Sequence, residues 1–502
     1  MSSTKGKSAG KGAGKGSKAA PADAAFVRQP PAVSIVRLAD TFNPLQATLT
    51  GIPGLPSVST MTVSSQFLIL GTHPGIIVGR PMTQDLLRGF ANPPGGGGAT
   101  SGGLAAPLDI AAHRGRITCL HVHTTSSTAT SASAPAAKAE WLLSGSEDGS
   151  LKLWELPSGT WRMGYAPVVG ASRDASSPSP SSEANAAAGG SLVDVASSVE
   201  SLTVDPSGGG GPEAAVVIAG LGNGTVTWWQ MLTGVALGSL KAHHGPISSI
   251  LVPCVPQADH PVALPTGGGP LVLTASGDGV SKLVSLKSRT LHTVMMAGGG
   301  VGGAGDGAPL LLCMTYDHPV AWIGRSDGRI VAFNVVTAAQ QGAFQPSEAA
   351  VNSLVLDHVA GDVLLAATDG GVIYLLSRKL WQVRYVFNPS LWSRGVPSVA
   401  NGAAPPHPLC LTHLCPWGGE APAPTAEGVT PSNPSAAAKA MGLVFAATLE
   451  GAVQIWDVAA TMQQIASVDE YTRQQLIAAR QSSAAAAGAS PKKGGGGKKG
   501  KK

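Results

Sequence analysis

The chain has few cysteines and no long apolar run, and each shortage narrows what the protein can be. Its five cysteines in 502 residues are too few and too scattered for a disulfide framework, and an odd count fits a reducing compartment. No stretch of 18 apolar residues occurs, so no membrane span is expected. The first residues are rich in Gly, Lys, Ser and Ala, which is not the pattern of a secretory signal peptide. We therefore expect an intracellular protein, cytoplasmic or nuclear.

Motifs for common catalytic chemistry are also missing. The sequence contains no phosphate-binding loop and no His-Glu-x-x-His zinc motif. The glycine clusters at 95–98 and 208–211 lack the Lys-Ser/Thr and the helix that would follow in a phosphate loop. These absences favour a protein that is not an enzyme and that needs no cofactor.

Charged residues make up only 13% of the chain, and its basic residues are concentrated at the two ends. Eleven lysines lie in the terminal segments: Lys5, Lys7, Lys11, Lys15, Lys18, Lys492, Lys493, Lys498, Lys499, Lys501 and Lys502. Without them, 23 basic residues face 29 acidic ones, so the body has a net charge of −6 while the whole chain has +5. Only the tails are suited to weak, salt-sensitive contact with RNA or an acidic partner.

A fifteen-residue frame occurs seven times and dominates the rest of the sequence. The gapless copies cover residues 68–82, 142–156, 217–231, 272–286, 321–335, 364–378 and 444–458. Position four is always Gly or Ala. Position eight is always Gly, at Gly75, Gly149, Gly224, Gly279, Gly328, Gly371 and Gly451. An internal repeat of this kind predicts a repetitive architecture.

Each frame has the pattern of a β-hairpin. Four mostly apolar residues precede a turn that often ends in Asp-Gly or Asn-Gly, which tolerate the positive φ of tight turns. Alternating apolar residues follow, as in Leu151 and Leu153. Flanking segments at 117–122, 247–252, 290–294 and 351–356 supply further strands. Four antiparallel strands per unit, repeated seven times, predict an all-β, seven-bladed β-propeller.

The chain resembles the WD-repeat (WD40) family at the superfamily level, over residues 58–468. Two frames end in Leu-Trp-Glu and Ile-Trp-Asp, at Trp154 and at Trp456-Asp457, close to the family's Trp-Asp ending. His113 and His243 stand where the family has its Gly-His opening, and Asp148 and Asp278 stand at its turn Asp. The resemblance implies that His113, Ser144 or Ser146, Asp148 and Trp154 form a hydrogen-bonded network within a blade. It places His243, Asp278, Trp456 and Asp457 in the same kind of network. It also implies protein–protein contacts through the top face, the rim and the blade edges.

Three features have competing interpretations. Zinc ligands could be offered by His407, Cys410, His413 and Cys415. In a strand, however, Cys410 would point to the opposite face from His413 and Cys415, so we favour an inner strand of the last blade and no metal.

A catalytic role is conceivable for His243-His244 and for His113 with Asp148. Their place in the frame favours a structural role instead. Trp228 and Trp229 point to opposite sides of a strand; we favour packing of both between blades, with one exposed ring as a possible partner contact as the alternative.

The expected organisation along the chain has four parts. Residues 1–31 form a disordered Lys/Gly/Ala-rich tail, 32–468 the propeller, 469–482 a short helix capped by Ser467, and 483–502 a disordered basic tail. Low-complexity insertions fall at 92–107, 124–139, 167–190, 253–269, 298–308 and 393–439. Either 32–38 or 462–468 closes the ring as an added strand.

A non-catalytic scaffold for protein–protein interactions is the function that these features favour. The alternatives are an RNA-associated factor, such as one of ribosome assembly, that uses the lysine tails, and a structural part of a ciliary or cytoskeletal assembly. No small-molecule substrate and no membrane contact are expected.

Overall fold

The structure is a computed structural model, and it describes the strands, their connecting turns and one helix. The described residues are 45–49, 57–82, 107–126, 138–166, 197–205, 214–253, 271–296, 309–357, 363–387, 411–417, 443–448 and 453–488. The predicted tail at 1–31, residues 489–502 of the second tail and nearly all of the predicted insertions lie outside these residues.

The strands form four-stranded antiparallel sheets, each built from consecutive strands. The first sheet contains β2 (Val58–Val63), β3 (Phe67–Thr72), β4 (Ile76–Pro81) and β5 (Leu108–Ala111). The second contains β6 (Ile117–Ser126), β7 (Lys138–Ser146), β8 (Leu151–Leu156) and β9 (Thr160–Tyr165). The third contains β10 (Val199–Asp205), β11 (Val216–Leu221), β12 (Thr225–Gln230) and β13 (Ala236–Lys241). The fourth contains β14 (Ser249–Leu251), β15 (Leu271–Ala275), β16 (Val280–Ser285) and β17 (Thr290–Met296).

Three more sheets complete the set of seven. The fifth contains β18 (Leu311–Asp317), β19 (Val320–Arg325), β20 (Ile330–Asn334) and β21 (Gln340–Phe344). The sixth contains β22 (Val351–Asp357), β23 (Val363–Thr368), β24 (Ile373–Ser377) and β25 (Gln382–Phe387). The seventh contains β26 (Leu411–Trp417), β27 (Leu443–Thr448), β28 (Val453–Asp457) and, at its outer edge, β1 (Leu45–Leu49).

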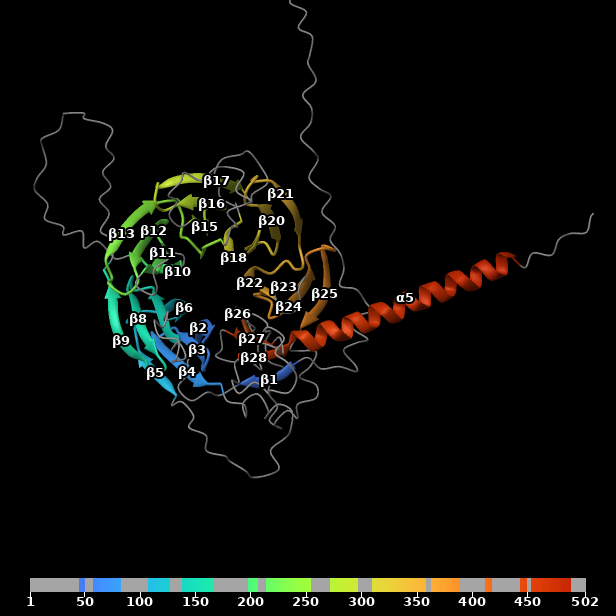
Figure 1. Ribbon diagram of the computed structural model, residues 1–502, viewed down its shortest axis with the longest axis horizontal. Helices are drawn as coiled ribbons and strands as arrows, with labels where there is room; N and C mark the ends of the chain where they lie inside the picture. Colours follow the sequence, from blue (N-terminus) through green and yellow to red (C-terminus); the bar gives the residue numbers. More distant parts are fainter. Residues whose placement is uncertain are drawn as a thin grey trace, which may run out of the picture.

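These sheets are arranged as the blades of a propeller (Figure 1). The first strand of each sheet lies innermost, and each innermost strand contacts that of the next sheet, with β26 returning to β2. The expected all-β propeller of four-stranded antiparallel blades is therefore confirmed. A closed ring leaves no sheet face exposed at its ends, which is the physical advantage of this architecture.

The ring is closed by a strand that the sequence analysis did not identify. β1 pairs antiparallel with β28, so that Ala47 lies opposite Ile455 and Leu49 opposite Val453. Residues 462–468 are helical, so the assignment of a strand there was wrong. The other candidate, 32–38, lies outside the described residues. Both ends of the propeller sequence thus contribute to one sheet.

The invariant glycine of the frame is needed at the β-turn between the second and third strands. Gly75 and Gly224 have φ values of 83° and 84°, a region that side chains disfavour. A Cβ atom on Gly75 would lie 2.3 Å from the carbonyl oxygen of His113, and one on Gly224 would lie 2.3 Å from that of His243. The carbonyl of Gly224 also accepts hydrogen bonds from the amides of Ala242 and His243. The turn therefore holds the segment that leads into the next blade.

The small residue at position four allows neighbouring blades to approach. A Cβ atom on Gly220 would lie 2.6 Å from Cγ2 of Ile247, the residue that precedes the next inner strand. Gly71 has the same relation to Ile117, and Gly145 to Val199. The expectation that this position permits close approach is confirmed.

Side chains near the start of the inner strands link five of the blades to the blade that follows. The Ser59 hydroxyl donates to the carbonyl of Ile117 (2.5 Å), Ser201 to Ile247 (2.7 Å) and Ser248 to Leu311 (2.6 Å). Thr118 donates in the same way to Val199, and the thiol of Cys313 to Val351. These contacts join five successive pairs of blades near the axis of the ring.

The core lies between the sheets. On β12, Trp229 packs with residues of the second sheet, while Trp228 packs with residues of the fourth. The same alternation occurs on β8, where Trp154 packs toward the first sheet and Leu153 toward the third. Each third strand of a blade therefore contributes to two interfaces, as expected for side chains that alternate across a strand.

In five blades, the outermost strand has one extra residue at the same point of its pairing with the third strand. In the pairing of β12 with β13, Trp228 lies opposite Gly238 and Trp229 opposite Ala236, which leaves Leu237 as a bulge. The corresponding bulge residues are Arg162, His292, Gln341 and Arg384. This bulge position recurs around the rim and interrupts the regular edge of each sheet.

The C-terminal helix α5 (Val458–Gly488) is longer than predicted and begins earlier. Asp457 caps it, because its carboxylate accepts a hydrogen bond from the Ala460 amide at 2.7 Å. The predicted cap, Ser467, instead lies within the helix and donates to the Gln464 carbonyl. The predicted boundary between propeller and helix, at 468/469, was therefore wrong. No helix in the described part of the chain is both long and apolar enough to span a membrane.

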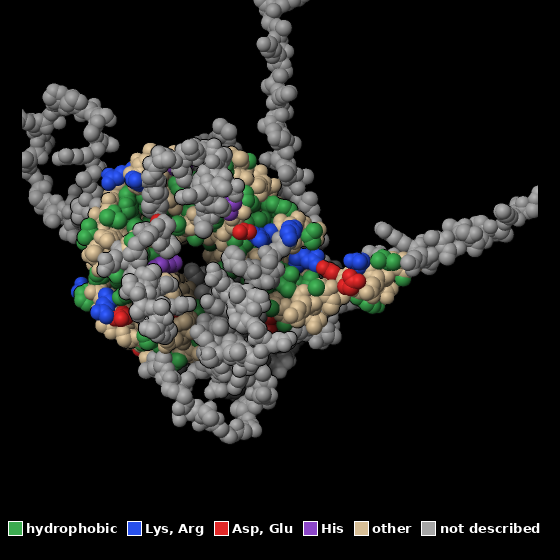
Figure 2. Space-filling view, viewed as in Figure 1, with side chains coloured by type: hydrophobic (Ala, Val, Ile, Leu, Met, Phe, Trp, Pro, Cys, Tyr) green, Lys and Arg blue, Asp and Glu red, His purple; other side chains and the backbone are tan. Residues whose placement is uncertain are grey.

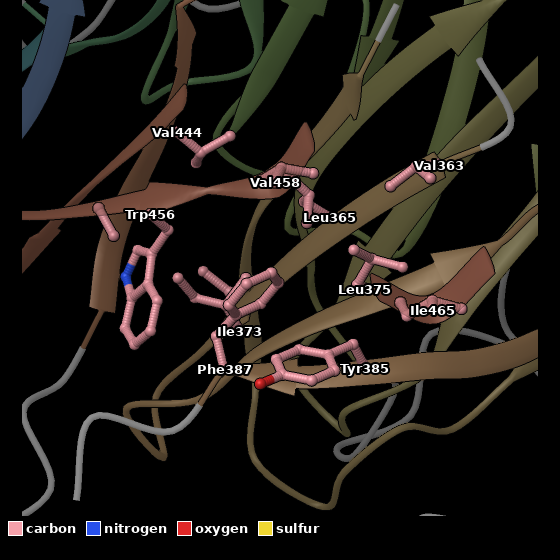
Figure 3. Packing of buried hydrophobic residues seen from close by; sticks show 12 residues of the cluster. Val363, Leu365, Ile373, Leu375, Tyr385, Phe387, Val444, Trp456, Val458 and Ile465 are labelled. Atoms are coloured by element: carbon pink, nitrogen blue, oxygen red, sulfur yellow. The ribbon is translucent and has the colours of Figure 1, made fainter. Parts of the chain in front are cut away.

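The first turns of α5 dock on the sixth and seventh sheets. Val458 and Ile465 pack with Tyr385, Phe387 and Trp456, whose rings form a row with centroids 4.9 Å and 5.2 Å apart (Figure 3). The outer bulge residue Arg384 forms an ion pair with Asp469. Beyond that pair, the helix projects away from the ring (Figure 1). Basic and acidic side chains gather where it leaves the ring (Figure 2).

Candidate functional site

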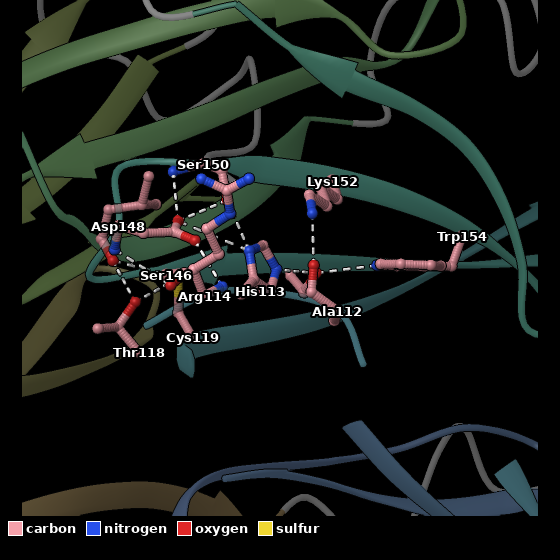
Figure 4. Close-up of polar contacts among 12 residues, drawn as sticks. Ala112, His113, Arg114, Thr118, Cys119, Ser146, Asp148, Ser150, Lys152 and Trp154 are labelled. Carbon is pink, nitrogen blue, oxygen red and sulfur yellow. Dashed lines mark hydrogen bonds and ion pairs between the residues drawn. The ribbon is translucent and has the colours of Figure 1, made fainter. Parts of the chain in front are cut away.

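The first candidate site is a hydrogen-bonded network around His113, between β5 and β6. Its Nε2 lies 2.7 Å from the Ser144 hydroxyl, which also accepts a hydrogen bond from the Trp154 indole at 2.9 Å. Its Nδ1 lies 2.6 Å from the Ser150 hydroxyl, which donates to Asp148 at 2.5 Å. Figure 4 shows His113 between the Asp148 end of this chain and Trp154.

The structure distinguishes between the two serines that the sequence offered. Ser144 joins His113 to Trp154, whereas the Ser146 hydroxyl accepts from the amide of Asp148 at 3.2 Å. Ser150 was not anticipated, although it stands between His113 and Asp148. The available signal was a hydroxyl side chain directly after the frame glycine, which only Ser150 and Thr225 provide among the seven frames.

A single direction of donation satisfies every member of this chain. Trp154 donates to Ser144, Ser144 donates to His113 Nε2, His113 Nδ1 donates to Ser150, and Ser150 donates to Asp148. This order requires a neutral imidazole with its proton on Nδ1. Both ring nitrogens are then occupied, so the imidazole has no free position to accept a proton from a substrate.

The electrostatics of the network agree with a structural role. Burial lowers the pKa of His113 to about 4, against an opposing effect of the nearby Asp148 carboxylate. Burial alone would raise the pKa of Asp148, but hydrogen bonds from Ser150 and from the Arg114 amide bring it down to about 2. His113 is therefore neutral and Asp148 ionised near neutral pH. A general base needs a pKa closer to the working pH.

A second network surrounds His243 in the fourth blade. Its Nε2 lies 2.8 Å from the Thr274 hydroxyl, and its Nδ1 lies 3.1 Å from the Asp278 carboxylate without an intervening serine. Burial would raise the pKa of Asp278, but the hydrogen bond and charge of His243 hold that pKa below its usual range. Val284 occupies the position of Trp154 and offers no donor to Thr274, whose hydroxyl donates to the Lys282 carbonyl.

Trp456 and Asp457, which the sequence placed in the same kind of network, have other partners. The Trp456 indole donates to the Gln454 side chain at 3.2 Å within the buried core. Asp457 caps α5, and burial raises the pKa of its carboxyl group. The structure therefore brings His113, Ser144, Asp148 and Trp154 together and His243 and Asp278 together, but gives Trp456 and Asp457 separate structural roles.

The suggestion that one ring of the Trp228–Trp229 pair is an exposed contact was wrong. Trp228 and Trp229 are 6% and 3% exposed. Trp229 lies against Tyr165 and donates to the carbonyl of Ala166 at 3.0 Å, while Arg289 of the next blade lies over the ring of Trp228. Both rings pack between blades, which is the interpretation that the alternation favoured.

The two other candidate sites have little support as chemical centres. The predicted inner strand of the last blade is confirmed as β26, which contains His413 and Cys415, while His407 and Cys410 lie outside the described residues. Among the residues that the structure describes, no three His, Cys, Asp or Glu side chains converge as metal ligands would. Two strings match Gly-x-Ser-x-Gly: 6–10, which lies outside the described residues, and 324–328. The second string forms the turn of a β-hairpin, where Ser326 accepts from the Leu310 amide, and not a strand-to-helix elbow.

Comparisons with known proteins do not indicate a function for this chain. No family model matches the chain, and no curated protein matches it. Among solved structures, the computationally designed Ika8 protein is similar with a TM-score of 0.45 and 12% identity, over 83% of this chain and 100% of that one. That similarity is too low to carry an argument, and the fold rests on the strand pairing described above.

Acid is expected to destabilise the fold through His113. Its pKa is lowered in the folded state, so the stabilisation is present above about pH 6.5 and is lost as the pH falls toward 4, where the unfolded chain binds the proton first. The largest loss from this group is about 3 kcal/mol. Urea unfolding at pH 7.5, 6.5, 5.5 and 4.5 measures it. His113→Asn should give a shallower pH dependence than the wild type, and parallel curves would contradict the assignment.

Proposed function

We propose that this protein is a non-catalytic scaffold that binds other proteins through the outer rim of three consecutive blades. The propeller fold is compatible with such a role, and the resemblance to WD-repeat proteins supports it. Fold alone does not identify a function, so the proposal rests on a surface feature of this chain.

That feature is a set of exposed apolar side chains, which we call the rim strip. It contains Trp161 of β9, Val235 and Leu237 at β13, and Leu291 and Val294 of β17, all between 45% and 57% exposed. These outermost strands follow one another around the ring (Figure 1). Adjacent exposed apolar groups on a folded protein commonly mark an interaction surface.

On the outermost strands of the next two blades, the exposed side chains are polar. On β21 the exposed side chains are Gln340 and Gln341, and on β25 the exposed side chain is Gln382. Leu237 and Gln341 occupy the same bulge position in their blades. The apolar character is therefore not a requirement of the fold at this position. Trp161 would supply the aromatic anchor that interfaces favour.

Leu237→Lys is expected to weaken partner binding strongly, and Gln341→Lys is the matched control because it places the same charge on the same bulge. Affinity purification from extract of the source cells, followed by quantitative mass spectrometry, measures both. The Leu237→Lys chain should recover the specific partners at least tenfold less well than the wild type, since a charge would be buried in the contact. Equal recovery with both variants would contradict the rim strip as the contact.

The lysine-rich ends favour one alternative, an RNA-associated factor. In that case binding would fall steeply with salt and disappear when residues 1–20 and 491–502 are deleted, while Leu237→Lys would have no effect. The scaffold proposal expects the opposite pattern. We also propose that the protein is not an enzyme, because the two His–Asp pairs that the sequence offered for catalysis, His113 with Asp148 and His243 with Asp278, are engaged in hydrogen bonds of the blades.

A further inference from the structure

One face of the inner strand β6 carries a row of polar and sulfur-containing side chains. Cys119, His121, His123 and Thr125 are two residues apart, and the register of β6 with β7 is unbroken from Cys119 onward. Residues two apart on a strand share a face. Leu120 and Val122, on the other face, pack with the first sheet, while Cys119 packs with the third. His121 and His123 therefore lie side by side on the surface of β6 that faces the third sheet.

Neither imidazole has a protein partner in the described part of the chain. His113, His243 and His318 all have hydrogen bonds at a ring nitrogen, but His121 and His123 have none. Their ring nitrogens are also not among the side-chain atoms that are sealed from solvent without a partner. Two half-buried imidazoles thus keep free lone pairs within reach of solvent. Unpaired polar groups in such a place call for a ligand or ordered water.

In the described part of the chain, neighbouring side chains do not occupy these rings. The indole of Trp141, which lies opposite His123, donates to Thr125 at 3.3 Å and not to the imidazole. An imidazole nitrogen that no protein group occupies can offer its lone pair to a metal ion.

We propose that His121 and His123 together bind one divalent transition-metal ion of the class that prefers imidazole, such as Ni²⁺, Cu²⁺ or Zn²⁺. Their Cα atoms are separated by about 7 Å, the repeat of two residues along a strand, so the two rings can converge on one ion at a metal–nitrogen distance of about 2 Å. No third His, Cys, Asp or Glu converges with them in the described residues, so the pair alone defines the site. This metal site lies on β6 and not on the rim strip, so the proposal does not rest on the scaffold function.

Nickel titration of the untagged full-length chain, followed by calorimetry, tests this pair. The variant carrying both His121→Gln and His123→Gln should lose one equivalent of Ni²⁺ relative to the wild type, and each single variant should bind that equivalent about tenfold more weakly or worse. His292→Gln, which removes an exposed rim histidine, is the matched control and should bind as the wild type. Ions held at His407–Cys415 would be common to all variants and cancel in the comparison.

A second measurement uses the wild-type chain and so does not depend on the folding of a variant. Copper with ascorbate oxidises histidines that hold the metal, and mass spectrometry locates the added oxygen. Oxidation should occur first in the peptide that contains His121 and His123, ahead of exposed His292. The proposal is overturned if the double variant and the wild type bind equal amounts of Ni²⁺, if neither binds any, or if oxidation spares His121 and His123.

Discussion

Replacing Trp154 with alanine is expected to lower the free energy of unfolding by about 3–5 kcal/mol, the usual cost of removing a large buried aromatic side chain. Trp154 is 5% exposed and packs with Phe67, Ile69 and Leu142 between the first two blades. Its indole also donates to Ser144, which holds His113. The substitution would therefore leave a cavity and an incomplete network. Equilibrium urea unfolding at pH 7.5 measures the loss.

Two further variants separate packing from hydrogen bonding at this position. Trp154→Phe keeps most of the apolar volume and removes the donor, so it should cost less than Trp154→Ala. Ser144→Ala leaves both the Trp154 indole and His113 Nε2 without their shared partner, at a cost of about 1–3 kcal/mol. If Trp154→Ala unfolded at nearly the same urea concentration as the wild type, the assignment of this ring to the core between blades would be wrong.

The repeating parts of this fold could be predicted from the sequence because one physical requirement recurs in every frame. Gly75 and Gly224 mark turns that need a positive φ and leave no room for a Cβ atom. The alternation at Trp228 and Trp229 indicated two opposite faces, and both rings are indeed buried on opposite sides. A hairpin and its side-chain alternation depend on local chemistry, which the sequence displays directly.

Features that depend on distant contacts were harder to identify. β1 is a short segment without a frame, and only its pairing with β28, more than 400 residues later, makes it a strand. Residues 462–468 alternate enough to suggest a strand, but Met462 and Ile465 pack as one helical face on the sixth and seventh sheets. His121 and His123 stand outside the frames, so the repeat gave no reason to examine them. Tertiary packing decided each of these cases.

Removing β1 is expected to have an effect of similar size to the loss of Trp154. The strand pairs with β28 at four positions, and Val453, Ile455 and Trp456 of β28 are buried. Each backbone hydrogen bond contributes about 1 kcal/mol, so the lost pairing costs on the order of 4 kcal/mol. The seventh blade would keep only three strands and would expose the edge of β28 to solvent. An exposed edge of this kind also favours aggregation.

A comparison of two truncated chains, one beginning at residue 41 and the other at residue 51, tests most directly whether β1 closes the ring. Urea unfolding should give the first chain the same midpoint as the full-length protein. The second chain should unfold at a clearly lower urea concentration, because it alone lacks β1. Equal midpoints for the two truncated chains would contradict a ring that is closed by pairing of β1 with β28.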